Sequence, residues 1–267
     1  MKKVLFIGLE KDEVKDIVQN VDEIIKTIHH EIIPEIVVKE QKLFVEHPNI
    51  VDCLVPIDMV VFHGIFADDF DVINALAIWD GICLPDPVAL LNCRLKLPCL
   101  ARAQRITKFK MPRGFVVKGN IEVEKESVAK WGNWHCGENK QRFVGKQNYQ
   151  QPTIIEPFID GIAVRILVIG EKYWQIQLKG DDWLKSIHHQ DAHIHSSVDE
   201  ELLQDTLNLK EHFQLEWIAV DYMVLPNGEK FMLEVNHIPN MDRFPEVRQH
   251  YTTFIGDWLQ NNISPTS

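Results

Sequence analysis

Apolar residues in the first 86 positions follow two alternating patterns. Short β-rich runs cover residues 4–7, 32–38, 59–62 and 82–84. Apolar residues recur at helical spacing over residues 17–28 and 68–79. Strands that alternate with helices are typical of an α/β lobe with a mainly parallel sheet, so we expect this fold class for the start of the chain.

The pattern changes near Asp86. Pro85-Asp86-Pro87 predicts a helix start, followed by β-rich runs at 115–117 and 127–130 and by a loop at 131–140 that is rich in Gly, Asn, Trp and His. The last third combines strands at 163–169, 173–178, 217–225 and 230–235 with helices at 199–213 and at the C-terminus. Asn227-Gly228 predicts a tight turn between the last two strands. We therefore expect an α/β protein of three lobes, at 1–86, 87–158 and 159–267.

Charge and cysteine content narrow the class of protein. The 267 residues include 28 Lys and Arg against 39 Asp and Glu, a net charge of −11. A surface this acidic repels nucleic-acid phosphates and anionic lipids, so we expect neither a nucleic acid nor a membrane as a partner. The five cysteines include no Cys-x-x-Cys pair, which indicates reduced thiols. The apolar run after Met1 is too short for a signal peptide or a membrane span, and we expect a cytoplasmic protein.

Three oxygen-bearing side chains lie on the predicted hairpin. Asp221 is in its first strand, and Glu234 and Asn236 are two positions apart in its second strand, where both side chains project to the same face. Together they would supply hard oxygen ligands for one or two Mg²⁺ ions that also hold substrate phosphates. Taken alone, the pattern also fits a solvated polar face on a hairpin.

A lysine precedes a loop that contains two glycines. Lys130 ends a β-rich run, and Gly132 and Gly137 follow it. A lysine beside closely approaching backbone N–H groups is an arrangement that holds phosphate. Because the loop lacks the Gly-x-x-x-x-Gly-Lys motif and contains Trp131 and Trp134, core packing is an equally good interpretation of these residues alone.

These residues belong to a longer series. In chain order it consists of Lys96, Lys130, the run 154–161, Arg165, Asp221, Glu234 and Asn236, which is the order found in ATP-grasp enzymes. Over residues 91–241 the chain resembles a compact ATP-grasp protein, closest in style to the branch that includes ribosomal-protein-modifying and glutathione-synthetase-like enzymes. The resemblance implies an ATP-grasp fold with an N-terminal α/β pre-grasp lobe, a small central lobe and a C-terminal lobe, with ATP between the last two.

The resemblance also implies a role for each residue of the series. It assigns the nucleotide phosphates to Lys96 and Lys130, and one or two Mg²⁺ ions to Asp221, Glu234 and Asn236. It assigns ATP to the hinge residues Glu156, Pro157, Phe158, Ile159 and Asp160. It places Arg165 at the reacting phosphoryl group or acyl phosphate, where a guanidinium stabilises growing negative charge.

Two positions depart from the family pattern. Ala163 stands where relatives often carry an acid that reaches the ribose, a task that Asp160 can take over. Asn240 follows Pro239 where glycine is usual, and asparagine is the other residue that best tolerates a positive φ.

The implied activity is an ATP- and Mg²⁺-dependent ligation that joins a carboxylate to an amine through an acyl phosphate. Its substrate is expected to be an amino acid, a peptide or a small metabolite. Two alternatives stay open, namely a catalytically silent ATP-binding regulatory protein and a small-molecule kinase on the same fold. Homo-oligomerisation is also left open.

Two residues outside the series are candidates for binding the second substrate. Arg243 follows the metal motif and could hold a substrate carboxylate by a bidentate pair, with Arg248 as a competitor. His63 ends a predicted parallel strand, where open α/β sheets place ligands, and packing is its alternative role. A polar loop also carries four histidines, which lack the fixed scaffold of a transition-metal site and predict a solvated loop: His188, His189, His193 and His195.

Overall fold

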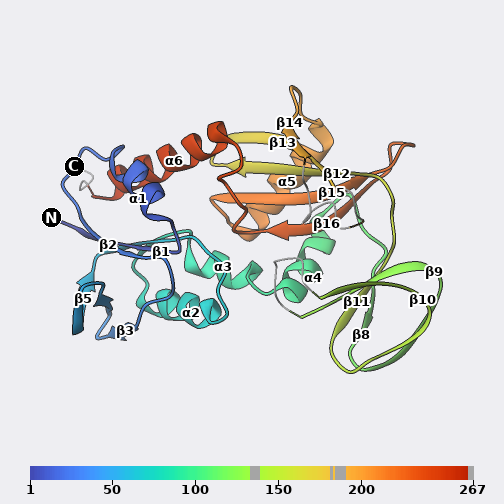
Figure 1. Cartoon of the computed structure of the whole chain (residues 1–267), viewed down its shortest axis with the longest axis horizontal. Coiled ribbons are helices and arrows are strands. Elements are labelled where there is room, and N and C mark those ends of the chain that lie inside the picture. The colour runs from blue at the N-terminus through green and yellow to red at the C-terminus, as the bar shows by residue number, and fades with distance from the viewer. Residues whose placement is uncertain (133–138, 181–182, 184–190, 264–267) are drawn as a thin grey trace. The chain divides into compact units, whose positions relative to one another are not determined.

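A computed structural model describes residues 1–132, 139–180, 183 and 191–263. The chain forms two compact units (Figure 1). The first unit consists of Met1–Leu91, Gln214–Glu216 and Ile238–Ser267, and the second of Asn92–Phe213 and Trp217–His237. The residues from Ile238 onward, which the sequence analysis assigns to the C-terminal lobe, thus pack with the N-terminal residues.

The first unit is built on a parallel sheet with the strand order β2-β1-β6-β7. Its strands are β1 (Lys3–Ile7), β2 (Lys26–His30), β6 (Met59–Phe62) and β7 (Ile82–Leu84). Its helices are α1 (Lys11–Val18), α2 (Asp69–Trp79), α3 (Pro87–Cys93, which ends in the second unit) and α6 (Pro245–Ile263). Every residue of β6 and all but the first of β1 are buried, as expected for central parallel strands covered on both faces. The predicted α/β class is confirmed.

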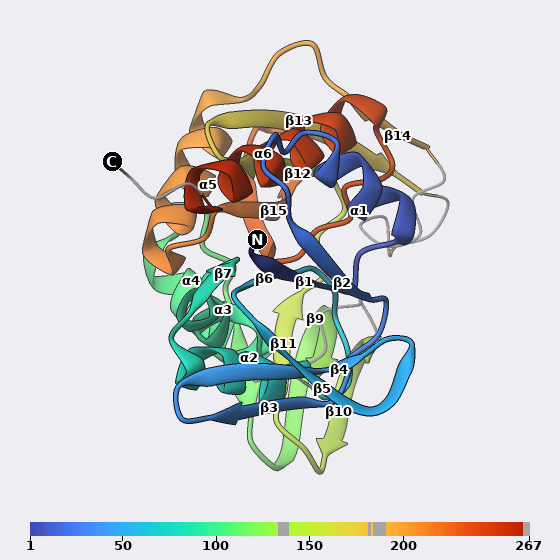
Figure 2. The ribbon, with the colours of Figure 1, turned by 90° about the vertical axis from the view of Figure 1, so that its left-hand side faces the viewer.

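Helices α1 and α6 lie side by side in both views (Figures 1 and 2). Gly256 on α6 allows this close approach, because a Cβ at that position would lie 2.7 Å from Cβ of Asn20. Helix α6 is therefore packed against α1.

The helix predicted over residues 17–28 is wrong beyond Val18. Lys26–His30 instead forms β2, and Ile28 is buried opposite Leu5 of β1. The isoleucine spacing fits a helical period, but pairing with the free edge of β1 satisfies the backbone groups of this segment and buries Ile28.

A three-stranded antiparallel meander follows β2. It consists of β3 (Ile36–Lys39), β4 (Lys42–His47) and β5 (Ile50–Ile57), and it contacts α2 (Figure 2). The sequence indicated only one β-rich run here, because the turns at 40–41 and 48–49 lack an Asn-Gly or Asp-Gly pair.

The second unit contains two antiparallel sheets. The smaller sheet has the order β10-β9-β11-β8, with β8 (Gly114–Val116), β9 (Gly119–Trp131), β10 (Lys140–Tyr149) and β11 (Thr153–Pro157). Its buried cluster is formed by Ala129, Phe143, Tyr149 and Ile155. The β-rich run predicted at 127–130 is the end of a 13-residue strand, whose charged first part the sequence analysis assigned to no element.

The larger sheet has the order β14-β13-β12-β15-β16. Its strands are β12 (Ile162–Ile169), β13 (Lys172–Lys179), β14 (Asp191–Ile194), β15 (Trp217–Val224) and β16 (Lys230–Asn236). Helix α5 (Glu200–Phe213) packs on β12 and β15, and α4 (Lys96–Ile106) contacts α5 and β16. The predicted hairpin is confirmed, with Gly228 at φ 88° in its turn. None of the described helices is long and apolar enough to cross a membrane.

Candidate functional site

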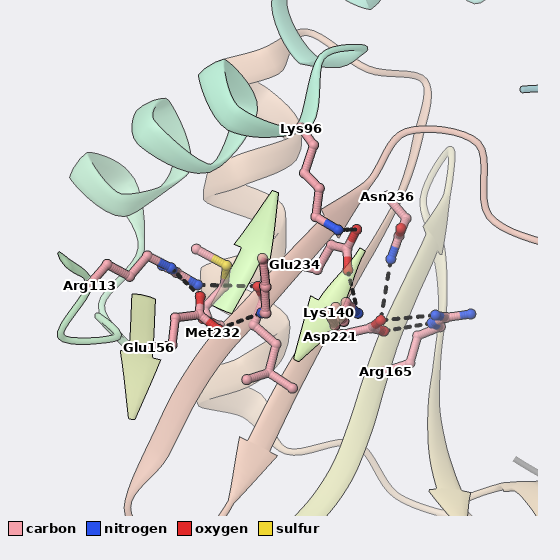
Figure 3. Close-up of polar contacts among 11 residues, drawn as sticks. Lys96, Arg113, Lys140, Glu156, Arg165, Asp221, Met232, Glu234 and Asn236 are labelled. Carbon is pink, nitrogen blue, oxygen red and sulfur yellow. Dashed lines mark hydrogen bonds and ion pairs between the residues drawn. The ribbon is translucent and has the colours of Figure 1, made fainter. Parts of the chain in front are cut away.

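The β15–β16 hairpin brings together the three oxygen ligands that its sequence predicts. Asp221 and Glu234 are register partners, and a bulge follows directly after Asp221. Both carboxylates are buried, and the Asn236 side-chain amide donates to Asp221 Oδ2 at 3.3 Å. The three groups therefore lie on one face of a rigid sheet (Figure 3), and their oxygens are of the type that Mg²⁺ prefers.

Arg165 lies opposite Asp221 on the neighbouring strand β12. Its Nε donates to Asp221 Oδ1 at 2.7 Å and one terminal nitrogen donates to Oδ2 at 2.9 Å (Figure 3). Burial alone would lower the pKa of this guanidinium, but the paired Asp221 carboxylate raises it. Arg165 is thus a permanently charged group fixed in place by a bidentate contact.

Two lysines approach the two oxygens of Glu234. Lys96, the first residue of α4, places Nζ 3.6 Å from Oε1, and Lys140, the first residue of β10, places Nζ 3.7 Å from Oε2. The pKa of Lys140 is lowered to about 8, mainly by burial. Glu234 acts to raise this pKa, and the nearby charges of Lys130 and Lys96 act to lower it. These distances exceed that of a hydrogen bond, so the lysines balance the charge of Glu234 without close contact.

Glu156 at the end of β11 is held between two further cations. Lys130 Nζ forms an ion pair with its Oε2, and Arg113 Nε donates to its Oε1 at 2.6 Å. Burial would raise the pKa of this carboxyl, but Lys130 and Arg113 outweigh it and the pKa is lowered. Arg113 also donates to the backbone carbonyls of residues 232 and 233, at 2.8 and 3.1 Å, which ties β11 to β16 (Figure 3).

A pocket opens beside these ion pairs. Its polar lining comes from Lys130, Lys140 and Glu156. Its remaining lining is mostly apolar: Met111, Val128, Pro157, Phe158, Ile159, Trp183, Met223 and Leu233. A mostly apolar pocket that two lysines also line suits a flat ring that carries an anionic tail.

The structure therefore brings most of the predicted series together in the second unit. Lys130 and the hinge residues Glu156 to Ile159 line the pocket, and Lys96, Arg165 and the hairpin ligands form the neighbouring charged cluster. Asp160 follows the hinge at an exposed position. Residues 133–138, which include Trp134 and Gly137 of the predicted phosphate loop, lie outside the described residues.

The two candidates for the second substrate lie in the first unit. His63 follows β6, and its Nδ1 shares a hydrogen bond of 2.5 Å with the Tyr251 hydroxyl. Burial lowers the pKa of His63 to about 4, so its ring is neutral at pH 7. Arg243 is exposed just before α6, and the competing Arg248 pairs with Asp16 of α1 at 3.3 Å.

The predicted histidine loop falls partly outside the described residues, which include neither His188 nor His189. His193 and His195 stack with their ring centroids 5.0 Å apart, and His195 Nε2 contacts Gln177 Oε1 at 3.1 Å. No group of three or more His, Cys, Asp and Glu side chains within the described ranges is placed to hold a metal ion. The hairpin residues do not form such a group of three, because they are two acids, Asp221 and Glu234, and one amide, Asn236.

Sequence reasoning missed two members of the charged cluster, Lys140 and Arg113. Lys140 was noted only as the last residue of the loop, and its pairing with Lys130 depends on the β9–β10 register. Arg113 lies outside any regular pattern, so no sequence signal singles it out.

No family model matches the chain, and no curated protein sequence matches it. Solved structures do. One is a RiPP-associated ATP-grasp ligase of Chryseobacterium gregarium in complex with ADP and a leader and core peptide, at 14% identity and a TM-score of 0.62, covering 99% of this chain and 98% of that chain. Another is D-alanyl-alanine synthetase A of Vibrio cholerae, at 13% identity and a TM-score of 0.67, covering 97% and 98%. The chain has the ATP-grasp fold.

A third similar structure is the macrocyclase MdnC of Microcystis aeruginosa bound to the precursor peptide MdnA, at 13% identity and a TM-score of 0.62, covering 97% of this chain and 99% of that chain. The similarity to these ATP-grasp proteins thus extends over almost the full length of each chain. At this level of identity it shows the fold and leaves substrate and reaction to be argued from the site.

Proposed function

We propose that this chain is an ATP- and Mg²⁺-dependent ligase that joins a carboxylate to an amine. The observation that carries the proposal is the buried cluster of cations and carboxylates beside the apolar pocket of the second unit. Buried charges are costly unless they are paired, so a protein that retains many of them usually uses them on a ligand. The ATP-grasp fold supports a nucleotide as that ligand.

The pocket would hold ATP. Its apolar wall suits the adenine ring, which the hinge residues Pro157, Phe158 and Ile159 would contact. Asp160 follows these residues in the sequence. Lys96 and Lys130 would neutralise the phosphates. Glu156 already accepts contacts from Lys130 and Arg113, so we infer that its main task is to hold the Lys130 ammonium in position.

Asp221, Glu234 and Asn236 would hold Mg²⁺. Their shared face, burial and oxygen chemistry fit this ion, and the lysines beside Glu234 keep the carboxylate charges balanced when it is absent. When bound, Mg²⁺ would neutralise phosphate charge and orient the triphosphate.

The remaining residues would align the reacting groups. In the proposed reaction a substrate carboxylate oxygen attacks the γ-phosphorus and ADP leaves, and the amine then attacks the acyl phosphate carbonyl and inorganic phosphate leaves. Arg165 is fixed by Asp221 and would stabilise the charge that develops on the transferred phosphoryl group. The chain's contribution is alignment and charge neutralisation, with no covalent intermediate on a side chain.

The substrate class is proposed from the similar structures. Two of them contain a leader and core peptide or a precursor peptide, so a peptide carboxylate or amine is our first choice over a single amino acid or a small metabolite. His63 and Arg243 remain candidates for contacting it, Arg243 through a bidentate pair with a carboxylate.

One observation favours a second candidate function. Both oxygens of Asp221 are already occupied by Arg165, which would suit a nucleotide-binding protein that turns over no substrate. A small-molecule kinase would use the same nucleotide site and differ only in keeping the phosphoryl group on its product.

ADP release separates these functions. The purified protein is incubated with Mg²⁺ and ATP, with a panel of carboxylates and peptides, each with and without added amines. A ligase releases ADP and phosphate and forms an amide only when both substrates are present. A kinase releases ADP with a stable phosphorylated product and no amine requirement. Absence of ADP release above background across the panel, with ATP still bound, would reject the ligase and support the silent binder.

A further inference from the structure

The ion-paired cluster of the second unit holds more positive than negative charge. Its cations are Lys96, Lys130, Lys140, Arg113 and Arg165, and its carboxylates are Glu156, Asp221 and Glu234. Among the described residues, five cations and three carboxylates leave an excess of two positive charges. The net charge of the whole chain is −11, so this local excess of positive charge has the opposite sign to the chain as a whole.

Lys140 is the lysine of this cluster to which no role toward the nucleotide has been assigned above. Its side chain is only 6% exposed, and its ion pair with Glu234 is 3.7 Å long. It lies opposite Lys130 in the β9–β10 register, and both lysines line the same pocket. Like charges at directly opposed strand positions repel each other, which makes this position costly for a lysine unless an anion binds there.

The position of Lys140 indicates which part of an anion it would meet. Its Nζ lies beside Glu234, a proposed Mg²⁺ ligand, and Mg²⁺ in such sites is shared with substrate phosphates. Lys130, by comparison, is drawn toward Glu156 at the hinge. Lys140 is therefore placed toward the outer phosphates of a nucleotide.

We propose that Lys140 is a third polyphosphate-binding cation, which makes the site select nucleoside di- and triphosphates over monophosphates. The inference rests on the proposed function, because it takes the pocket to be the nucleotide site. The inference goes beyond the proposed function by assigning the outer phosphates of the nucleotide to a residue of β10.

A purely structural role for Lys140 makes the opposite prediction for the ligand-free protein. If the pair with Glu234 stabilised the fold, replacing Lys140 by a neutral residue would lower the melting temperature. If Lys140 is retained for an anion, the neutral residue removes a repulsive buried charge, while Lys96 still balances Glu234. The melting temperature without ligand then stays the same or rises.

The test measures dissociation constants for AMP, ADP and ATP by isothermal titration calorimetry with Mg²⁺ present. The variants are Lys140→Met, the charge-retaining Lys140→Arg, and the control Lys146→Met, which removes an exposed lysine from the same strand. Melting temperatures are recorded without nucleotide.

We expect Lys140→Met to weaken ADP and ATP binding about 10- to 100-fold and AMP binding less than about 3-fold, since one charge-assisted contact is lost. Lys140→Arg should recover part of the ATP affinity, and Lys146→Met should match the wild type. An unchanged ratio of ATP to AMP affinity in Lys140→Met, or a lower melting temperature with unchanged affinities, would overturn the role of Lys140 alone. Wild-type protein that binds none of the three nucleotides would overturn the proposed function as well.

Discussion

Lys130 illustrates how one side chain of the cluster can serve both ligand and fold. From the sequence alone, Lys130→Ala is expected to weaken ATP binding far more than it changes stability. The structure alters that expectation, because Lys130 and Glu156 are a buried ion pair and the substitution leaves Glu156 with Arg113 only. Removing one partner of a buried pair costs about 3–5 kcal/mol when the other charge is left uncompensated, and because Arg113 still pairs with Glu156 we expect a cost below that range.

We therefore predict that Lys130→Ala lowers both ATP affinity and the free energy of unfolding measured in urea without nucleotide. Lys130→Met, which keeps the apolar stem of the side chain and leaves the pair of Glu156 with Arg113 intact, should recover part of the stability and none of the ATP affinity. Lys125→Ala, at an exposed position of the same strand β9, is the matched control. Full wild-type stability in Lys130→Ala would show that the pair with Glu156 contributes nothing to the fold.

The sequence predicts those site residues whose spacing along the chain determines where their side chains lie. Glu234 and Asn236 are two apart on one strand, and the Asn-Gly turn places Asp221 across from them. Arg113 and Lys140 could not be found in this way. Each reaches the cluster through tertiary pairing, Arg113 with Glu156 and Lys140 through the β9–β10 register.

At the scale of elements, a carboxyl group with a strongly shifted pKa lies on α1 near the segment that leads into α6. Glu13 on α1 is buried and accepts a hydrogen bond from the Glu10 backbone N–H at 2.7 Å. The pKa of Glu13 is raised to about 7, mainly by burial. The neighbouring Asp242, just before α6, also raises it, and the Glu10 N–H and Arg248 act in the opposite direction. The folded state therefore holds this proton more tightly than the unfolded chain does.

The sign of the pH effect follows from this shift. Protonated Glu13 contributes its stability in full below about pH 4.5, and the contribution is lost as the pH rises toward about 7. Glu13→Gln cannot ionise, and its amide can still accept from Glu10 N–H and donate to Asp242. We predict that it is more stable than the wild type by about 2 kcal/mol at pH 8, with a difference that shrinks toward pH 5.

Urea unfolding of the wild type and Glu13→Gln between pH 5 and 8 measures this difference. Asp12→Asn, an exposed carboxylate on the same helix, is the control and should give a difference that does not vary with pH. A pH-independent difference for Glu13→Gln as well would contradict the raised pKa.

An element is predicted well when the spacing of its apolar residues fits either a helix or a strand, and poorly when the spacing fits both. Helix α2, helix α5 and the β15–β16 hairpin match the ranges expected from apolar spacing and turn residues. Ile28 fits both a helix and a strand, and only its pairing with Leu5 decides between them. The first part of strand β9 was missed although Ile121 and Val123 alternate with exposed glutamates, which is the pattern of a half-exposed strand.

At the scale of the whole molecule, the net charge of the chain is negative, whereas the buried ionic cluster of the second unit carries an excess of positive charge. An overall charge of −11 disfavours long phosphate backbones, whereas the buried excess of cations favours a small phosphate-bearing ligand that can enter the pocket. Absence of a nucleic-acid partner and a cytoplasmic location stay predictions. The fold itself is shown by similarity to solved structures over almost the full length at 10–14% identity, whereas no family model and no curated protein sequence matches the chain.

The central claim is that the hairpin carboxylates and the lysine-lined pocket form one Mg²⁺-nucleotide site. Titration calorimetry of ATP into the wild type and into Asp221→Asn/Glu234→Gln, each with Mg²⁺ and with EDTA, tests it most directly, with circular dichroism as the check on folding. We predict that the wild type binds one ATP and loses at least about tenfold in affinity when Mg²⁺ is removed, as expected when about 1.4 kcal/mol or more of metal-mediated binding is lost. The double variant should remain folded and bind ATP weakly, with no dependence on Mg²⁺. A folded double variant that binds ATP as tightly as the wild type, with the same dependence on Mg²⁺, would contradict the account.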